Sequence, residues 1–227
     1  MTKSQKLLLT AAVLSIALWG IPIARYLILP LEYLNTHFHE LAHAIMALAT
    51  GGQPDYIIVN ADGSGSTPVS GGSIFLIASA GYPGTAILGS LLILAGRTTK
   101  NAQSILKTLA IILALSLLLL IRGDIVGVIS ALIWIPALWF ASIKLKAENL
   151  QLATQFLGVQ MCLTSFHSFL LLLNSSLLTN SHSDAYILQE RTFIPDYIWA
   201  AGWTLFSLII VIMSLKIAWS PVRIKDR

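Results

Sequence analysis

Charged residues are scarce in this sequence, and cysteine is almost absent. Only 11% of the 227 residues are Asp, Glu, Lys or Arg, while 56% are hydrophobic. Soluble domains carry about 25% charged residues. The single cysteine, Cys162, excludes an internal disulfide and a cysteine-rich metal cluster. We therefore predict an integral membrane protein embedded in the lipid bilayer, with one domain over residues 1–227.

The sequence also lacks a basic stripe and an internal repeat. Its net charge is +4, but the Lys and Arg residues lie between apolar runs rather than along one surface. This distribution does not indicate nucleic-acid binding, so we expect no nucleic-acid partner, and it is typical of residues that orient a membrane protein. Two related halves with paired broken helices would indicate a transporter, and no such internal symmetry is present.

Long apolar runs fill most of the chain. A helix needs about 20 apolar residues to cross a bilayer. We expect the first run to stay attached as an anchor, because it is too long for a signal-peptide core. The six predicted spans are 7–29, 72–96, 104–121, 124–143, 152–173 and 197–218. The predicted fold is therefore an all-α integral membrane protein with about six transmembrane helices, a further motif-bearing helix and a short β-hairpin-like loop within 51–72.

The motif-bearing segment 33–50 decides the predicted topology. A seventh full crossing there would place the basic N- and C-termini on opposite faces of the membrane. If 33–72 is instead re-entrant, both termini and most Lys and Arg residues lie on one side, as the positive-inside rule favours. We therefore expect a multi-pass protein with both termini cytoplasmic and the polar loop 174–196 on the opposite side.

The stretch "LNTHFHELAHAIMALATGG" (34–52) carries the clearest chemical signal. His39 and His43 are four residues apart, so on a helix they share one face and can bind one Zn²⁺. Glu40 is turned by about 100° from His39 and can act as the general base for a zinc-activated water. Ionisable residues inside a membrane segment are costly and are functional candidates by default. This pattern predicts metal binding and hydrolysis.

The motif "HELAH" at the start of an apolar run, followed by "ALATGG", resembles the site-2-protease class of intramembrane zinc metallopeptidases, M50B-like branch. The resemblance extends through "ASAGYPGTAILGS" (78–90) and "NSHSDAYILQERTFIPDYIWAAGW" (180–203). It implies a zinc metalloendopeptidase that cleaves a membrane-associated polypeptide. The Asn-x-x-Pro…Asp-Gly pattern that supplies the third ligand in typical site-2 proteases is absent, so this ligand has to come from elsewhere.

The third zinc ligand is the open question. A catalytic zinc has three protein ligands plus a water. The candidates are His167, His182, Asp184, Glu190 and Asp196. We expect Asp184, since the resembling proteins carry Ser-Asp-Ala at this place, with His182 as the second choice. The alternative role for Asp184 is to cap a short helix.

Three further features have structural interpretations. His37 points away from His39 on a helix and is expected at an interface rather than on the metal. The glycines of 81–89 predict a thin helix face that packs closely, in one version against the motif segment. Tyr197, Trp199 and Trp203 are typical of an interfacial aromatic belt.

Two rival functions remain beside the peptidase. One is a non-proteolytic metal-binding protein of the same architecture, which the presence of Glu40 disfavours because a pure binding site needs no general base. The other is a small transporter whose histidines line an ion path.

Overall fold

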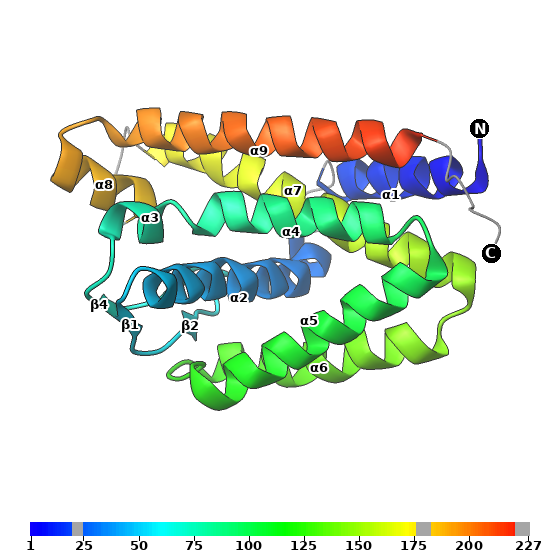
Figure 1. The fold of residues 1–227 in the computed structure, drawn as a ribbon, viewed down its shortest axis with the longest axis horizontal. Coiled ribbons are helices and arrows are strands. Elements are labelled where there is room, and N and C mark those ends of the chain that lie inside the picture. The colour runs from blue at the N-terminus through cyan, green and yellow to red at the C-terminus, as the bar shows by residue number, and fades with distance from the viewer. Residues whose placement is uncertain (20–24, 176–182, 221–227) are drawn as a thin grey trace.

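The chain folds into a bundle of helices with a small β segment at one end (Figure 1). The computed structural model describes the backbone of residues 1–19, 25–175 and 183–220, and the side chains within 1–18, 28–163 and 183–220. Within these ranges the helices are α1 (Lys3–Trp19), α2 (Arg25–Ala49), α3 (Ile74–Ala78), α4 (Gly81–Ala95), α5 (Thr99–Leu119), α6 (Ile125–Lys144), α7 (Ala147–Ser175), α8 (Asp184–Thr192) and α9 (Asp196–Trp219). The strands are β1 (Gln53–Pro54), β2 (Ile58–Val59), β3 (Gly65–Ser66) and β4 (Val69–Ser70).

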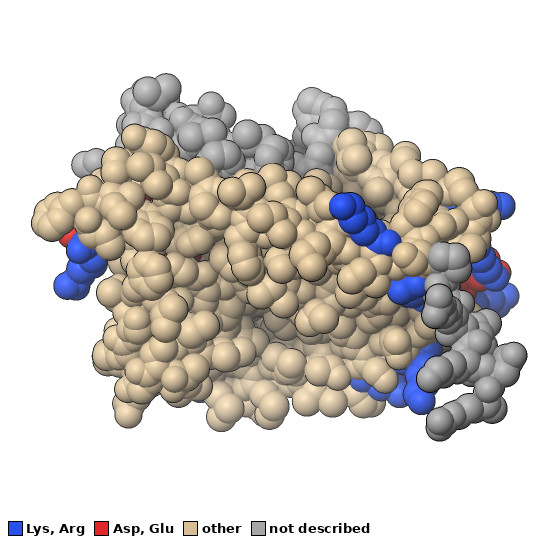
Figure 2. All heavy atoms as spheres, turned by 45° about the horizontal axis from the view of Figure 1, so that its top comes forward, with Lys and Arg blue, Asp and Glu red and all other residues tan. Residues whose placement is uncertain are grey.

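The outer surface of the bundle is apolar. Among the described residues, α5, α6 and α9 are long and apolar enough to cross a membrane, and α4 is a shorter apolar helix. Large hydrophobic side chains on these helices stay exposed, such as Leu118 at 71%, Ile133 at 60% and Leu205 at 61%. In Figure 2, Lys and Arg gather near the ends of the molecule, and most of the wall between them carries no charge. A surface of this kind suits lipid, so the chain is an all-α membrane protein.

Two predicted span boundaries are wrong. The predicted first span, 7–29, includes residues 25–29, but these belong to α2, which runs unbroken to Ala49 and contains Pro30. The predicted span 72–96 is divided between α3 and α4, with Ser79 as the C-cap of the first and Ala80 as the N-cap of the second. Apolar composition alone hides the break between α3 and α4, because the helices on both sides of it are apolar.

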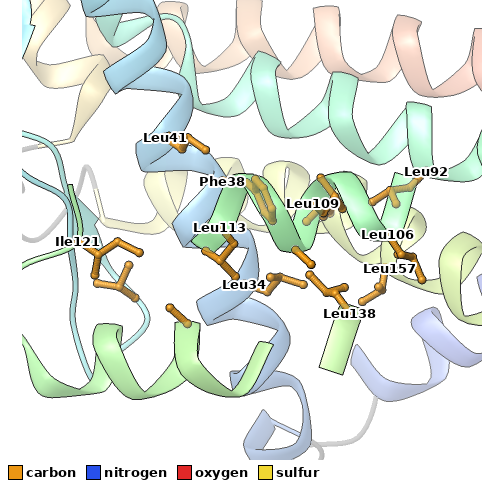
Figure 3. Close-up of a cluster of buried hydrophobic side chains, with 14 of the residues drawn as sticks. Leu34, Phe38, Leu41, Leu92, Leu106, Leu109, Leu113, Ile121, Leu138 and Leu157 are labelled. Atoms are coloured by element: carbon orange, nitrogen blue, oxygen red, sulfur yellow. The ribbon is translucent and has the colours of Figure 1, made fainter. Parts of the chain in front are cut away.

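Helix α2 lies within the main hydrophobic core. Its Leu34, Phe38 and Leu41 pack against side chains from the surrounding helices (Figure 3). The neighbours labelled there are Leu92 of α4, Leu106, Leu109 and Leu113 of α5, Leu138 of α6 and Leu157 of α7, together with Ile121. A helix covered on several sides is held firmly by dense packing. The core therefore fixes the helix that carries the HELAH motif.

The polar segment after α2 folds back along this helix. β1 pairs with β4 and β2 with β3, both antiparallel, so that one short ladder is nested within the other. The hydroxyl groups of Tyr33 and Thr36 on α2 donate hydrogen bonds to the carbonyls of Ala61 and Gly63. On its other side, Ile57 forms a parallel bridge with Ile121. The segment is thus fixed between α2 and the turn that joins α5 to α6.

The start of α1 and the end of α9 lie at the same end of the molecule (Figure 1). The Gln5 side-chain amide donates to the Trp219 carbonyl over 2.6 Å. Arg97, just after α4, donates to the Ser220 carbonyl, and Lys3 forms an ion pair with Glu148 at the start of α7. The β segment, α3 and α8 lie at the opposite end. The end with the start of α1 therefore carries Lys3 and Arg97, and the opposite end carries α3, α8 and the β segment.

Candidate metal centre

Three ionisable side chains from α2 and α8 converge at one point. Asp184 Oδ2 lies 3.1 Å from His39 Nε2 and 3.2 Å from His43 Nε2. Single ligand atoms from the three residues all lie within 4.8 Å of one another, and no other such group of His, Cys, Asp or Glu occurs among the described residues. Since Asp184 is 145 residues away from His39 in the chain, the fold creates this cluster.

The imidazole of His43 is oriented by the backbone of α3. Its Nδ1 lies 2.6 Å from the carbonyl oxygen of Ile77. A carbonyl only accepts, so Nδ1 carries the proton and Nε2 presents its lone pair to the cluster. Nε2 is buried and faces Asp184 Oδ2 at 3.2 Å, but it forms no hydrogen bond of regular geometry. A carbonyl behind one ring nitrogen and an open second nitrogen is the arrangement of metal-binding histidines.

Asp184 is not the N-cap of α8, which was the alternative role predicted for it. The N-cap of α8 is Ser183, whose hydroxyl accepts a hydrogen bond from the Tyr186 N–H. Asp184 is the first residue of the helix, and its carboxylate points to the two histidines. The side chain is 19% exposed, so the cluster is close to the surface without being open to it.

Glu40 lies beside the histidine pair and is bound by the polar segment. The Thr67 hydroxyl donates a 2.7 Å hydrogen bond to Glu40 Oε2. Gly65 covers the other oxygen, because a Cβ built there would come within 2.5 Å of Oε1. The residue is only 4% exposed. The loop 51–72 therefore orients the general-base candidate and shields it from water.

Helix α4 makes room for both imidazoles. Gly81 faces His39 and His43, and a Cβ there would lie 2.6 Å from His43 Nε2. A Cβ on Gly84 would lie 2.9 Å from the Cβ of Ala42. The glycines therefore allow close packing of α4, as predicted, and the helix that α4 packs against is the motif helix α2.

The other candidates lie elsewhere. His37 is buried, and its Nε2 lies 2.8 Å from the Ser130 hydroxyl of α6. It therefore lies between α2 and α6 and not on the metal cluster. Asp196 accepts from the Tyr197 N–H at the start of α9. Neither Asp196 nor Glu190 belongs to the cluster. The side chain of His167 and the whole of His182 lie outside the described residues.

Sequence patterns alone do not indicate Thr67 and Tyr82, and they misplace Trp203. Thr67 is 27 residues from Glu40 and carries no motif signal. Tyr82 directly follows Gly81, and its ring contacts His39 with a centroid distance of 4.6 Å. Trp203 is 8% exposed and stacks on Tyr82, so it belongs to the core rather than to an interfacial belt. Tyr197 is half exposed, at 50%.

The donor set fits a zinc ion. Zinc binds imidazole nitrogen and carboxylate oxygen at about 2.0–2.2 Å in a tetrahedron, which places neighbouring ligand atoms roughly 3.3 Å apart. The 3.1 and 3.2 Å separations between Asp184 and the two histidines match this spacing. The buried Nε2 of His43, which faces the Asp184 carboxylate without a regular hydrogen bond, would be satisfied by such an ion. Three protein ligands leave a fourth position for water or substrate.

Two histidines and a carboxylate converge within an apolar helical bundle, and this donor set could hold a metal ion. A comparison with family models agrees: the model described as Peptidase M50B-like matches residues 8–214. The chain therefore belongs to the M50B-like peptidase family. No curated protein and no solved structure gives a match.

Proposed function

We propose that this protein is a membrane-embedded zinc metalloendopeptidase that hydrolyses peptide bonds of a membrane-associated polypeptide. His39, His43 and Asp184 hold the zinc ion, and Glu40 is the general base. Family membership supports a membrane peptidase. The observation that carries the proposal is the convergence of the three side chains with their ligand atoms within 4.8 Å.

In this proposal the residues around the site have separate roles in peptide hydrolysis. A zinc ion held by His39, His43 and Asp184 would supply a Lewis acid for the scissile carbonyl and would lower the pKa of a water molecule at the site. Glu40 accepts the proton of the attacking water and delivers it to the leaving amine. The Thr67 hydroxyl donates to Glu40 Oε2 and fixes the orientation of this carboxylate beside the histidine pair. Burial keeps bulk water away from this carboxylate.

We further propose that the end of the molecule carrying the start of α1 and the end of α9 faces the cytoplasm. Lys3 and Arg97 contact Glu148 and Ser220 at that end. Helix α5 begins and α6 ends at the same end (Figure 1), with Lys100 in the first turn of α5, Lys144 as the last residue of α6 and Lys146 just after it. Cytoplasmic loops are enriched in Lys and Arg. The metal cluster then lies toward the opposite membrane face, where α8 and the β segment are found.

The test is zinc-dependent cleavage by the full chain. The purified protein is reconstituted in lipid vesicles with a single-span polypeptide, treated with a chelator and then resupplied with Zn²⁺. We expect cleavage to stop on chelation and to return with zinc. A protein that binds zinc and cleaves none of a panel of single-span polypeptides would support the non-proteolytic alternative, and zinc-dependent ion flux would support a transporter.

A further inference from the structure

A stack of aromatic rings connects the metal cluster to α9. The Tyr82 ring lies 4.6 Å from the His39 ring, centroid to centroid, at an interplanar angle of 71°. On its other side Tyr82 lies 6.0 Å from the Trp203 ring at 30°, a stacked arrangement. Both distances fall in the range in which aromatic pairs attract each other. Tyr82 thus lies between a candidate zinc ligand and a buried tryptophan.

The two histidines are oriented by different means. His43 is fixed by a hydrogen bond to the Ile77 carbonyl. His39 is more exposed, with 13% of its side chain accessible against 6% for His43. Its ring meets Tyr82 on one side and His43 on another, the latter at 4.8 Å and 77°. The His39 ring is therefore oriented by its 3.1 Å contact with Asp184 Oδ2 and by two edge-to-face ring contacts, where His43 has a backbone carbonyl instead.

Helix geometry explains why Tyr82 can reach His39. Gly81 has no side chain, so the first turn of α4 comes directly against the two imidazoles. The next residue, Tyr82, then extends past His39 toward α9. Trp203 is 8% exposed and packs in a cluster with Ala185, Leu188 and Ala200. This cluster also contains the residue that follows Asp184, so one apolar unit supports both Tyr82 and the start of α8.

We propose that Tyr82 is a positioning residue that holds the His39 imidazole in its metal-binding orientation, with Trp203 supporting the tyrosine ring from behind. This inference rests on the proposed zinc site. The positioning is assigned to the aromatic ring of Tyr82, which contacts His39 edge-to-face. Residues that orient a metal ligand affect metal affinity by about 10–100-fold when they are replaced.

The experiment measures metal binding rather than cleavage. Full-length protein in detergent is titrated with Zn²⁺ and, separately, with Co²⁺, whose visible absorption spectrum reports ligand geometry. The variants are Tyr82→Leu, which removes the ring, and Tyr82→Phe, which keeps it. Tyr197→Leu is the matched control, since the same change is made at a 50% exposed tyrosine of α9. Thermal unfolding is recorded for each variant.

We expect Tyr82→Leu to weaken zinc binding by about tenfold and to change the Co²⁺ spectrum, while Tyr82→Phe and Tyr197→Leu stay within about twofold of wild type. Wild-type affinity and spectrum in Tyr82→Leu would overturn the inference, as would equal losses in Tyr82→Leu and Tyr82→Phe. If Tyr82→Leu does not fold, Tyr82→Met takes its place with the same outcomes. A wild-type protein that binds no metal would instead overturn the proposed function, and this inference with it.

Discussion

The Nδ1 atom of His43 lies 2.6 Å from the carbonyl oxygen of Ile77, the residue before the last of helix α3. This contact joins the motif helix to the short helix that follows the β segment. It fixes the tautomer in which Nε2 faces Asp184. A backbone carbonyl cannot be removed by side-chain substitution, so the orientation depends on where α3 ends and α4 begins.

We expect two of the α2 histidines, His43 and His37, to differ in function, the first as a metal ligand and the second as a packing residue. His43→Ala removes a ligand, and zinc content should fall from about one per chain to near zero. His37→Ala should keep the zinc, because His37 pairs with Ser130 of α6. It should instead lower stability by about 1–3 kcal/mol, since it leaves a buried hydroxyl with one partner fewer. Zinc analysis and thermal unfolding of both variants check this division, and zinc loss in His37→Ala would contradict it.

A single methyl group on α4 should disturb the metal cluster. A Cβ at position 81 would lie 2.6 Å from His43 Nε2, so Gly81→Ala must displace the imidazoles and lower zinc occupancy. Gly202→Ala on α9 is the matched control, because nothing lies within 4 Å of a Cβ there. We expect zinc content to drop in the first variant only. Equal zinc content in both would mean that α4 does not pack against the site as described.

The neighbouring residues Ser183 and Asp184 should also give different results. Asp184→Ala removes the carboxylate that meets both histidines, so zinc occupancy should fall sharply. Ser183→Ala removes only the N-cap of α8, which costs about 1 kcal/mol and should leave most of the zinc. His182→Ala is the third variant. If zinc survives in Asp184→Ala and is lost in His182→Ala, the ligand is the histidine.

The sequence is sufficient to predict the residues of the first motif. The four-residue spacing of His39 and His43 places both on one helix face whatever surrounds the helix. The long apolar runs likewise indicate a membrane protein, because an uncharged apolar stretch of about 20 residues is what a bilayer-spanning helix requires. Both features are local, and local features can be predicted without knowing the fold.

The contacts that complete the site are not local. Thr67 reaches Glu40 only because the β segment folds back along α2, and nothing in its neighbours indicates this. Trp203 resembles an interfacial residue by its position after Pro195, but the tertiary packing of α4 on α9 buries it. The division of 72–96 into α3 and α4 could not be predicted either, because hydropathy does not show where one apolar helix ends and the next begins.

The orientation in the membrane follows from the two ends of the bundle. We expect both termini on the cytoplasmic side and the segment around Ala61 opposite. In a Cys162→Ala background, single cysteines are introduced as Thr2→Cys, Ser220→Cys and Ala61→Cys and labelled with a membrane-impermeant reagent in intact cells. Only the cysteine at position 61 should react before the cells are opened. Labelling of one terminus but not the other would contradict the shared end seen in Figure 1.

The proposed peptidase mechanism is tested most directly by Glu40→Gln, with zinc content and cleavage measured on the same reconstituted sample. The amide is nearly isosteric with the carboxylate and leaves His39, His43 and Asp184 in place, but it cannot transfer the proton. We predict about one zinc per chain in both wild type and variant, with cleavage reduced by about 10²–10⁴-fold in the variant. Unchanged cleavage by zinc-loaded Glu40→Gln would contradict the general-base role of Glu40 and the mechanism built on it.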